Sequence, residues 1–187
     1  MVALENLADR VRPLQRVEYD RMVDLGLLAN EKVELIKGFI VRMSPQNVKH
    51  ASVVQNLNHF LVLALVGSGR AAVRVQLPLA LTDDSEPEPD VAVVPPGSYK
   101  ESHPTRALLV IEVADSSLRF DRGDKADVYA AGGVAEYWIV DTRHDLIEVH
   151  TDIVDGVYSR VTPYRRGQSL SLGAFSDVLV RVDDILG

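Results

Sequence analysis

Apolar residues recur at helical spacing in three stretches of the chain. The longest stripe lies within residues 48–66 and consists of Val53, Val54, Leu57, Leu61 and Leu65. A shorter stripe falls within residues 17–28, and a third within residues 121–132, where Gly132-Gly133 interrupts it. Side chains spaced three and four residues apart share one face of a helix, so the pattern predicts three amphipathic helices over these ranges.

Short apolar runs around these helices predict the strands of an α/β sheet. A hairpin is expected from residues 33–36 and 39–43, because Gly38 in the intervening turn supplies the positive φ that tight turns require. The run 107–113 is apolar except for Glu112, which is typical of a strand buried on both faces. Other strands are expected at 72–81, 91–94 and 134–141, and near the C-terminus at 146–151, 157–162, 169–172 and 178–182.

Length and composition predict a single domain that spans residues 1–187. A chain of this length buries roughly 70% of the surface of its unfolded form, enough for one core. The chain has no cysteine, which excludes disulfide scaffolds, thiolate zinc sites, iron–sulfur clusters and cysteine nucleophiles. Its longest apolar run, residues 60–66, is far shorter than the roughly 20 residues of a membrane helix. Glu5 and Asp9 are atypical of a secretory signal, so we expect a cytoplasmic protein without a membrane partner.

The net charge of -7 argues against a generic nucleic-acid binder, whose affinity depends on lysine and arginine. The charge is unevenly distributed, because residues 1–80 are basic overall and residues 81–187 are strongly acidic. The acidic residues are densest at Asp83, Asp84, Glu86, Glu88 and Asp90. This density predicts an exposed acidic loop with a cation site at its end.

Three polar residues break the apolar pattern around them. Asp90 opens a strand, Glu112 interrupts a buried strand, and Lys125 lies on the core-facing stripe of a helix. If the two strands are neighbours, the carboxylates would repel each other and favour a divalent cation between them. Magnesium is commonly held by one or two carboxylates with water and phosphate, and a nearby lysine could stabilise charge on a phosphoryl group or help deprotonate the attacking water.

The sequence around these residues closely resembles the Uma-two family, small bacterial endonucleases within the PD-(D/E)XK restriction-endonuclease-like superfamily. The resemblance covers residues 17–186 and rests on VELIKGFIVRMSP, His50, EPEPDVAVV and LLVIEVADSSLRFDRGDKADVYAAGGVAEYWIVD. It implies a restriction-endonuclease-like α/β core with a mixed β-sheet flanked by helices, beside an N-terminal hairpin and a C-terminal β segment. It also implies hydrolysis of phosphodiester bonds that depends on Mg²⁺, with Mn²⁺ as the alternative ion.

The resemblance assigns five positions of this chain to the family's site. The metal-binding aspartate falls on Asp90, the strand glutamate on Glu112 and the lysine on Lys125. Glu34 matches an earlier acidic position of the family, and His50 matches the histidine at the start of the long helix. In the superfamily pattern the lysine follows two residues after the glutamate, where this chain has Ala114. Lys125 would therefore have to reach back from the helix to the same place.

A purely structural interpretation is also open for each of these residues. Asp90 follows Pro89, as residues of a turn often do. Glu112 and Lys125 could form a buried ion pair, and Glu34 could be a solvated strand residue. His50 could bond a backbone group at the helix start. Tyr137 and Trp138 are expected to pack in the core.

Two functions of different classes follow from these observations. The first is a Mg²⁺-dependent endodeoxyribonuclease in which Asp90 and Glu112 hold the ion and Lys125 stabilises the transition state, assisted by Glu34 and His50. The second is a non-catalytic dimeric module that binds nucleic acid or a protein partner. The sequence leaves open the substrate's structure, the specificity of cutting and the biological role. In both cases a homodimer is expected, with the C-terminal β segment and the region of Trp138 as contact surfaces.

Overall fold

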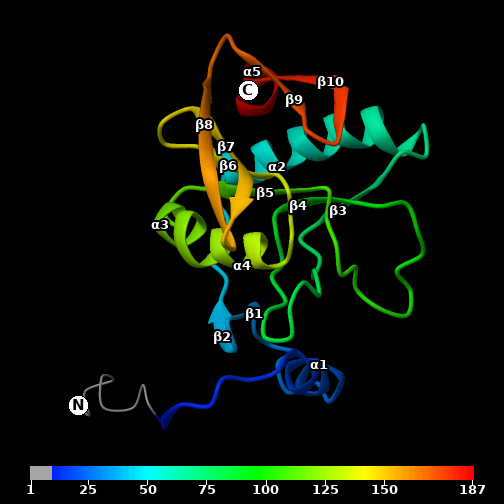
Figure 1. Ribbon diagram of the computed structural model, residues 1–187, viewed down its shortest axis with the longest axis vertical. Helices are drawn as coiled ribbons and strands as arrows, with labels where there is room; N and C mark the ends of the chain where they lie inside the picture. Colours follow the sequence, from blue (N-terminus) through cyan, green and yellow to red (C-terminus); the bar gives the residue numbers. More distant parts are fainter. Residues whose placement is uncertain (1–9) are drawn as a thin grey trace.

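A six-stranded mixed sheet forms the centre of the computed structural model, which describes residues 10–187 (Figure 1). Its strands lie in chain order: β3 (Ala72–Val75), β4 (Val91–Val94), β5 (Leu109–Ala114), β6 (Tyr137–Asp141), β7 (Leu146–Val154) and β8 (Val157–Arg165). Strands β5 and β6 pair in parallel, and the other neighbours pair antiparallel. A parallel pair requires a crossover, which the helical segment between β5 and β6 provides. The predicted mixed α/β fold is therefore confirmed.

Side chains of β5 alternate between the two faces of the sheet. Leu109, Ile111 and Val113 belong to a core cluster with the apolar face of α2 (Val48–Leu61), which continues as the π-helical turn η3 (Val62–Val66). Val110 and Ala114 belong to a second cluster, on the face covered by α4. Glu112 lies between these two along the strand, so its side chain points toward α4.

The crossover contains one π-helical turn. It runs from α3 (Leu118–Phe120) through η4 (Asp121–Lys125), the π-helical part, to α4 (Ala126–Ala131). The predicted helix over 121–132 therefore exists, but begins at residue 118. A π turn widens the helix by one residue and occurs often at functional sites. Here it places the buried side chains of Asp121 and Lys125 at its two ends.

The N-terminal part forms a helix and the predicted hairpin. Strands β1 (Val33–Ile36) and β2 (Phe39–Arg42) pair antiparallel, and Gly38 has a φ of 78° in the turn. Helix α1 (Arg16–Asp24) is shorter than the predicted 17–28, because Gly26 adopts a left-handed φ of 72°. Strand β3 ends at residue 75, not at the predicted 81. The reason is that Gln76 has a φ of 52° and Pro78 lacks the N–H that a strand would use.

The acidic segment 83–90 is not the exposed loop that the sequence predicted. Glu86 pairs through its backbone with Leu35 of β1, and this pairing covers the segment. Glu86 and Asp90 are buried, and of the five acids only Asp83 is exposed. Acidic side chains that lie close together in sequence are expected to repel one another and to be exposed, but the pairing of this segment with β1 buries two of them.

The C-terminal part forms the predicted β segment. Strands β9 (Ser169–Leu172) and β10 (Phe175–Arg181) make a separate hairpin that packs on the α2 side of the core, and α5 (Val182–Leu186) follows. Strands β7 and β8 extend further than predicted, and β10 begins earlier. Tyr137 and Trp138 are fully buried, as expected for core residues. The Trp138 side chain itself is therefore not available for a dimer contact.

None of the helices within residues 10–187 is both long and apolar enough to cross a membrane. Glu5 and Asp9, on which the expectation about a secretory signal depended, lie outside the described residues.

Candidate active site

Asp90 and Glu112 are brought together by the antiparallel pairing of β4 and β5. Val91 pairs with Ile111, so Asp90 lies opposite Glu112 at the next position of the register. The backbone N–H of Asp90 donates to Glu112 Oε2 at 3.3 Å, and the N–H of Val113 donates to Asp90 Oδ2 at 2.9 Å. The two strands are therefore neighbours, which was the condition for a shared carboxylate site.

Lys125 reaches the same place from the helical crossover. Its Nζ donates to Glu112 Oε1 at 3.0 Å and to Glu34 Oε2 at 2.5 Å. Tyr129, one turn further along the helix, donates its hydroxyl to Glu112 Oε1 at 2.5 Å. Lys125 is 4% exposed, and both of its carboxylate partners are buried as well. Lys125 thus supplies, from the helix, the ammonium beside Glu112 that the superfamily pattern expects from position 114.

Glu34 and His50 complete the set from two other elements. Glu34 lies on β1 and accepts the backbone N–H of Glu88 at 3.0 Å. His50 lies in the first turn of α2, where Asn47 caps the helix by accepting the N–H of His50. The Nε2 atom of His50 lies 2.9 Å from Asp90 Oδ2. Glu34 is therefore not a solvated strand residue, and His50 contacts a residue of the predicted site.

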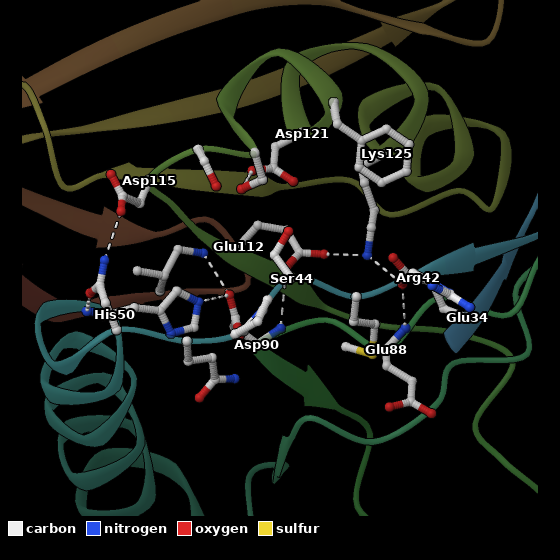
Figure 2. Close-up of a pocket in the computed structure, with 18 residues that line it drawn as sticks. Glu34, Arg42, Ser44, His50, Glu88, Asp90, Glu112, Asp115, Asp121 and Lys125 are labelled. Atoms are coloured by element: carbon white, nitrogen blue, oxygen red, sulfur yellow. Dashed lines mark hydrogen bonds and ion pairs between the residues drawn. The ribbon is translucent and has the colours of Figure 1, made fainter. Parts of the chain in front are cut away.

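These five side chains line one pocket with about 120 Å³ of space for water-sized molecules (Figure 2). Acidic side chains outnumber basic ones around it. The acidic lining residues are Glu34, Glu88, Asp90, Glu112, Asp115 and Asp121, and the basic ones are Arg42, His50 and Lys125. All five sequence-predicted site residues thus lie in one place, although they come from five different elements or loops.

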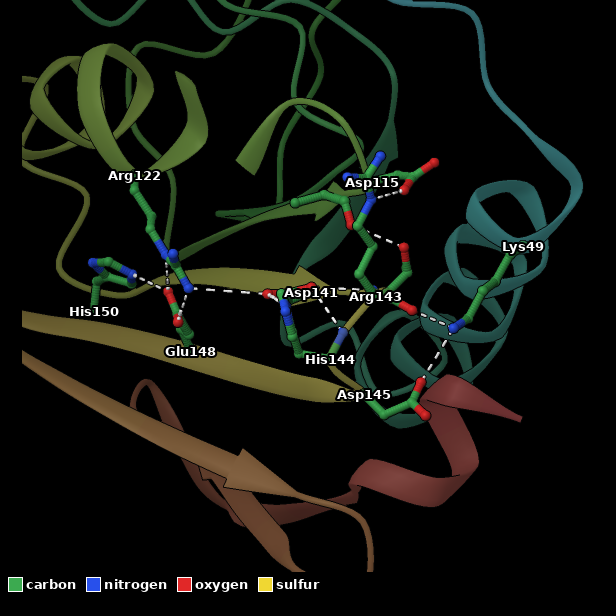
Figure 3. Close-up of polar contacts among 11 residues, drawn as sticks. Lys49, Asp115, Arg122, Asp141, Arg143, His144, Asp145, Glu148 and His150 are labelled. Carbon is green, nitrogen blue, oxygen red and sulfur yellow. Dashed lines mark hydrogen bonds and ion pairs between the residues drawn. The ribbon is translucent and has the colours of Figure 1, made fainter. Parts of the chain in front are cut away.

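A network of polar contacts supports the rim of the pocket (Figure 3). Asp115 accepts Arg143 Nε at 2.6 Å and Asn47 Nδ2 at 2.7 Å. Lys49 donates its ammonium to the carbonyl of Thr142 in the turn between β6 and β7. Because Asn47 also caps α2, its hydrogen bond to Asp115 connects the first turn of α2, which carries His50, to the residue that follows β5.

Burial and charge shift the pKa values of the groups in the pocket. Burial raises the pKa of Glu112 to about 8, against the opposing effect of Lys125. Burial likewise raises the pKa of Asp121 to about 6, although its hydrogen bond from Ser117 lowers it. Burial disfavours the ammonium of Lys125, but Glu112 and Glu34 together outweigh it, so the pKa of Lys125 rises and the side chain stays protonated at neutral pH.

The residues present fit a divalent cation held by two carboxylates. Within the described part of the chain, no group of three or more histidine, aspartate or glutamate side chains converges as a complete ligand set. Magnesium does not need one, because it commonly takes one or two carboxylates and completes its octahedron with water and phosphate. Asp90 and Glu112 supply such a pair, and the excess of acidic side chains around them favours a cation.

Sequence reasoning missed three residues that line the pocket or contact this set. Asp121 was interpreted only as the start of a helix, although its position four residues before Lys125 places both on one side of it. Tyr129 lies four residues after Lys125 on the same helix face, where an aromatic residue is typical of core packing, and it donates to Glu112. Gln76, whose Nε2 donates to Asp90 Oδ1 at 3.2 Å, carries no signal in the sequence.

Comparison with known proteins identifies the family. The structure is similar to the crystal structure of a putative nuclease belonging to DUF820 from Anabaena variabilis, with a TM-score of 0.66 and 14% sequence identity, covering 82% of this chain and 89% of that chain. This likeness concerns the fold. No curated protein matches the sequence. A family model, Uma2, described as putative restriction endonuclease, matches residues 16–182. Because that match spans most of the chain, the resemblance seen in the motifs is confirmed, and the protein belongs to the Uma2 family of putative restriction endonucleases.

Proposed function

We propose that this protein is a metal-dependent endonuclease that hydrolyses phosphodiester bonds in DNA, with Mg²⁺ or Mn²⁺ held by Asp90 and Glu112. The observation that carries the proposal is the pairing of these two buried carboxylates in a pocket where acids outnumber bases. A phosphodiester is itself an anion, so such a pocket would repel it. A divalent cation bound there would offset the negative charge of the pocket and allow the phosphodiester to bind.

The side chains of the pocket have distinct roles in this proposal. When bound, the ion would neutralise the phosphate and polarise its P–O bonds. Lys125 is protonated and stabilises the negative charge that develops on the phosphoryl oxygens. Glu34 holds the Lys125 ammonium in place. His50 and Gln76 fix the orientation of the Asp90 carboxylate, because they contact its two oxygens.

The test is a titration with Mg²⁺ and Mn²⁺ followed by a cleavage assay on a panel of nucleic acids. The panel contains double-stranded, single-stranded, branched and modified DNA, with RNA of the same sequences. We expect DNA to be cut only with metal present, and chelation to abolish cutting. Absence of cleavage with either metal on every substrate would contradict the proposal.

One observation favours the alternative, a non-catalytic module that retains the nuclease fold. Lys125, Glu34 and Glu112 form a closed and buried group of ion pairs, which could serve stability alone. Such a module has no use for a divalent cation. Metal binding measured by calorimetry therefore separates the two functions even before a substrate is known.

Magnesium affinity should rise with pH up to about 8. At lower pH the ion must displace the proton that the raised pKa of Glu112 keeps on this carboxyl, so the affinity should increase by about tenfold per pH unit below that value. Calorimetry in two buffers of different ionisation enthalpy should show close to one proton released at neutral pH. A pH-independent affinity would contradict this role of Glu112.

The same pKa shift has a consequence for the metal-free protein. The folded state holds this proton more tightly than the unfolded chain, in which the pKa is near its ordinary 4.5. The stabilisation is therefore complete below about pH 4.5 and is lost as the pH rises through about 8. Denaturant melts of the metal-free protein should therefore show that the contribution of Glu112 to the free energy of unfolding decreases between these two pH values.

We also propose that the protein is a homodimer in the cytoplasm. One small pocket can cut both strands of a duplex only if a second copy, related by a two-fold axis, presents another. The hairpin of β9 and β10 is the remaining candidate contact surface, and Leu179 on it is exposed. Analytical ultracentrifugation at micromolar concentration should give a dimer, and a strict monomer would contradict it.

A further inference from the structure

The proposed reaction needs a group that accepts a proton from water, and Lys125 cannot be that group. Its ammonium is held between two carboxylates, which keep it protonated. Glu112 is one of the two carboxylates that would hold the ion, and Glu34 accepts the Lys125 ammonium through Oε2. Both oxygens of Asp90 are in contact with side chains as well, Oδ1 with Gln76 and Oδ2 with His50.

Asp121 is a buried carboxylate of this pocket that has no basic partner among the described residues. It is 4% exposed, and within residues 10–187 no lysine, arginine or histidine lies within ion-pair distance of it. Ser117 Oγ donates to its Oδ2 at 2.6 Å. The other oxygen, Oδ1, accepts no hydrogen bond in the described part of the chain and is not enclosed by protein atoms. One oxygen of a buried carboxylate is thus free at the wall of the pocket.

The other acidic lining residues are placed differently. Asp115 is engaged by Arg143 and Asn47 at the rim. Figure 2 shows the carboxylate of Glu88 turned away from the centre, whereas Asp121 projects from the helical side toward Asp90 and Glu112. Asp90, Glu112 and Asp121 do not converge as ligands of one ion. Asp121 is therefore placed beside the expected ligand pair and not within it.

We propose that Asp121 is the general base that takes a proton from the water attacking phosphorus, an inference that rests on the proposed nuclease function. The water oxygen forms the new bond to phosphorus, and its proton passes to the free oxygen of Asp121. The electron pair of the breaking P–O bond leaves with the sugar oxygen, which takes up a proton from solvent. General bases of this kind commonly contribute about 100-fold to 10,000-fold in rate.

The electrostatics of Asp121 suit this role. Burial raises its pKa to about 6, the hydrogen bond from Ser117 and the charge of Lys125 lower it, and the nearby Asp90 and Glu34 raise it. A base works best when its pKa is close to the working pH. The π turn also places Asp121 and Lys125 on the same side of the helical segment, so that base and cation face one substrate.

The experiment is the variant Asp121→Asn, studied in the full-length protein. The amide keeps the shape of the side chain and can still accept from Ser117, but it cannot take up a proton. We expect kcat for DNA cleavage to fall about 100-fold or more, with KM and the calorimetric Mg²⁺ affinity unchanged. A second readout needs no activity: at about pH 8 the metal-free variant should melt at a higher temperature, because a buried carboxylate without a basic partner has been removed.

Asp124→Asn is the matched control, because Asp124 lies on the same helical segment but is exposed and pairs with Lys37. It should leave cleavage unchanged and should not raise the melting temperature. If Asp121→Asn melts lower than wild type, or loses Mg²⁺ binding, the residue is structural or a ligand, and the inference is wrong. If wild type cuts DNA and Asp121→Asn cuts equally well, the base is another group while the proposed function stands. If wild type cuts nothing with either metal, the function itself fails and the inference with it.

Discussion

The Lys125→Met variant should lose about 3–5 kcal/mol of folding free energy together with metal-dependent cleavage. Removing the ammonium leaves the Glu34 carboxylate buried without a cation, beside Glu112, whose raised pKa keeps it protonated below about pH 8. An unpaired buried charge of this kind is strongly destabilising, whereas an exposed ion pair contributes little. Denaturant melts measure the stability. Cleavage is assayed under conditions where circular dichroism shows the variant folded, and it should fall by about 100-fold or more.

Two further variants test the cause of this loss. Lys37→Met is the matched control, because Lys37 is an exposed lysine that also pairs with two carboxylates, and its loss should cost about 1 kcal/mol or less. Adding Glu34→Gln to Lys125→Met removes the stranded carboxylate and should restore part of the stability, a coupling that a double-mutant cycle measures. Full stability and full cleavage in Lys125→Met would show that the buried pairs serve neither fold nor reaction.

Asp90→Asn and Glu112→Gln should each abolish measurable Mg²⁺ binding and lower cleavage by about 100-fold to 1000-fold. The two changes preserve the size of the side chains and remove the negative charge that the ion requires. Glu112→Gln should also remove the contribution of Glu112 to the pH dependence of the free energy of unfolding, because its carboxyl with the raised pKa is no longer present. Calorimetry and the cleavage assay measure both effects.

A suitable control for these two variants is Asp177→Asn. Asp177 is an exposed acid on β10 that pairs with Arg70 and does not line the pocket. It should bind Mg²⁺ and cleave as wild type does. Unchanged Mg²⁺ affinity in either Asp90→Asn or Glu112→Gln would rule out the shared ion and leave the non-catalytic module as the better account.

Features set by local pattern could be predicted from the sequence. The hairpin around Gly38, the long helix α2 and the buried strand β5 each follow from periodicity or from the backbone freedom of glycine, which neighbouring residues alone determine. Glu112 stood out because a carboxylate interrupted an apolar run. The family motifs then identified Asp90, Lys125, Glu34 and His50, and the structure brings all five into one pocket.

Tertiary structure decided how these residues meet. Lys125 and Glu34 are 91 positions apart, and their contact depends on how the N-terminal hairpin packs against the crossover. Register between β4 and β5 aligned Asp90 with Glu112, while pairing with β1 buried the acidic segment that the sequence predicted to be exposed. Asp121, at the start of the π turn, lines the same pocket. Burial, register and pairing are properties of segments distant in sequence, so the shifted pKa values that follow from them exist only once the chain has folded.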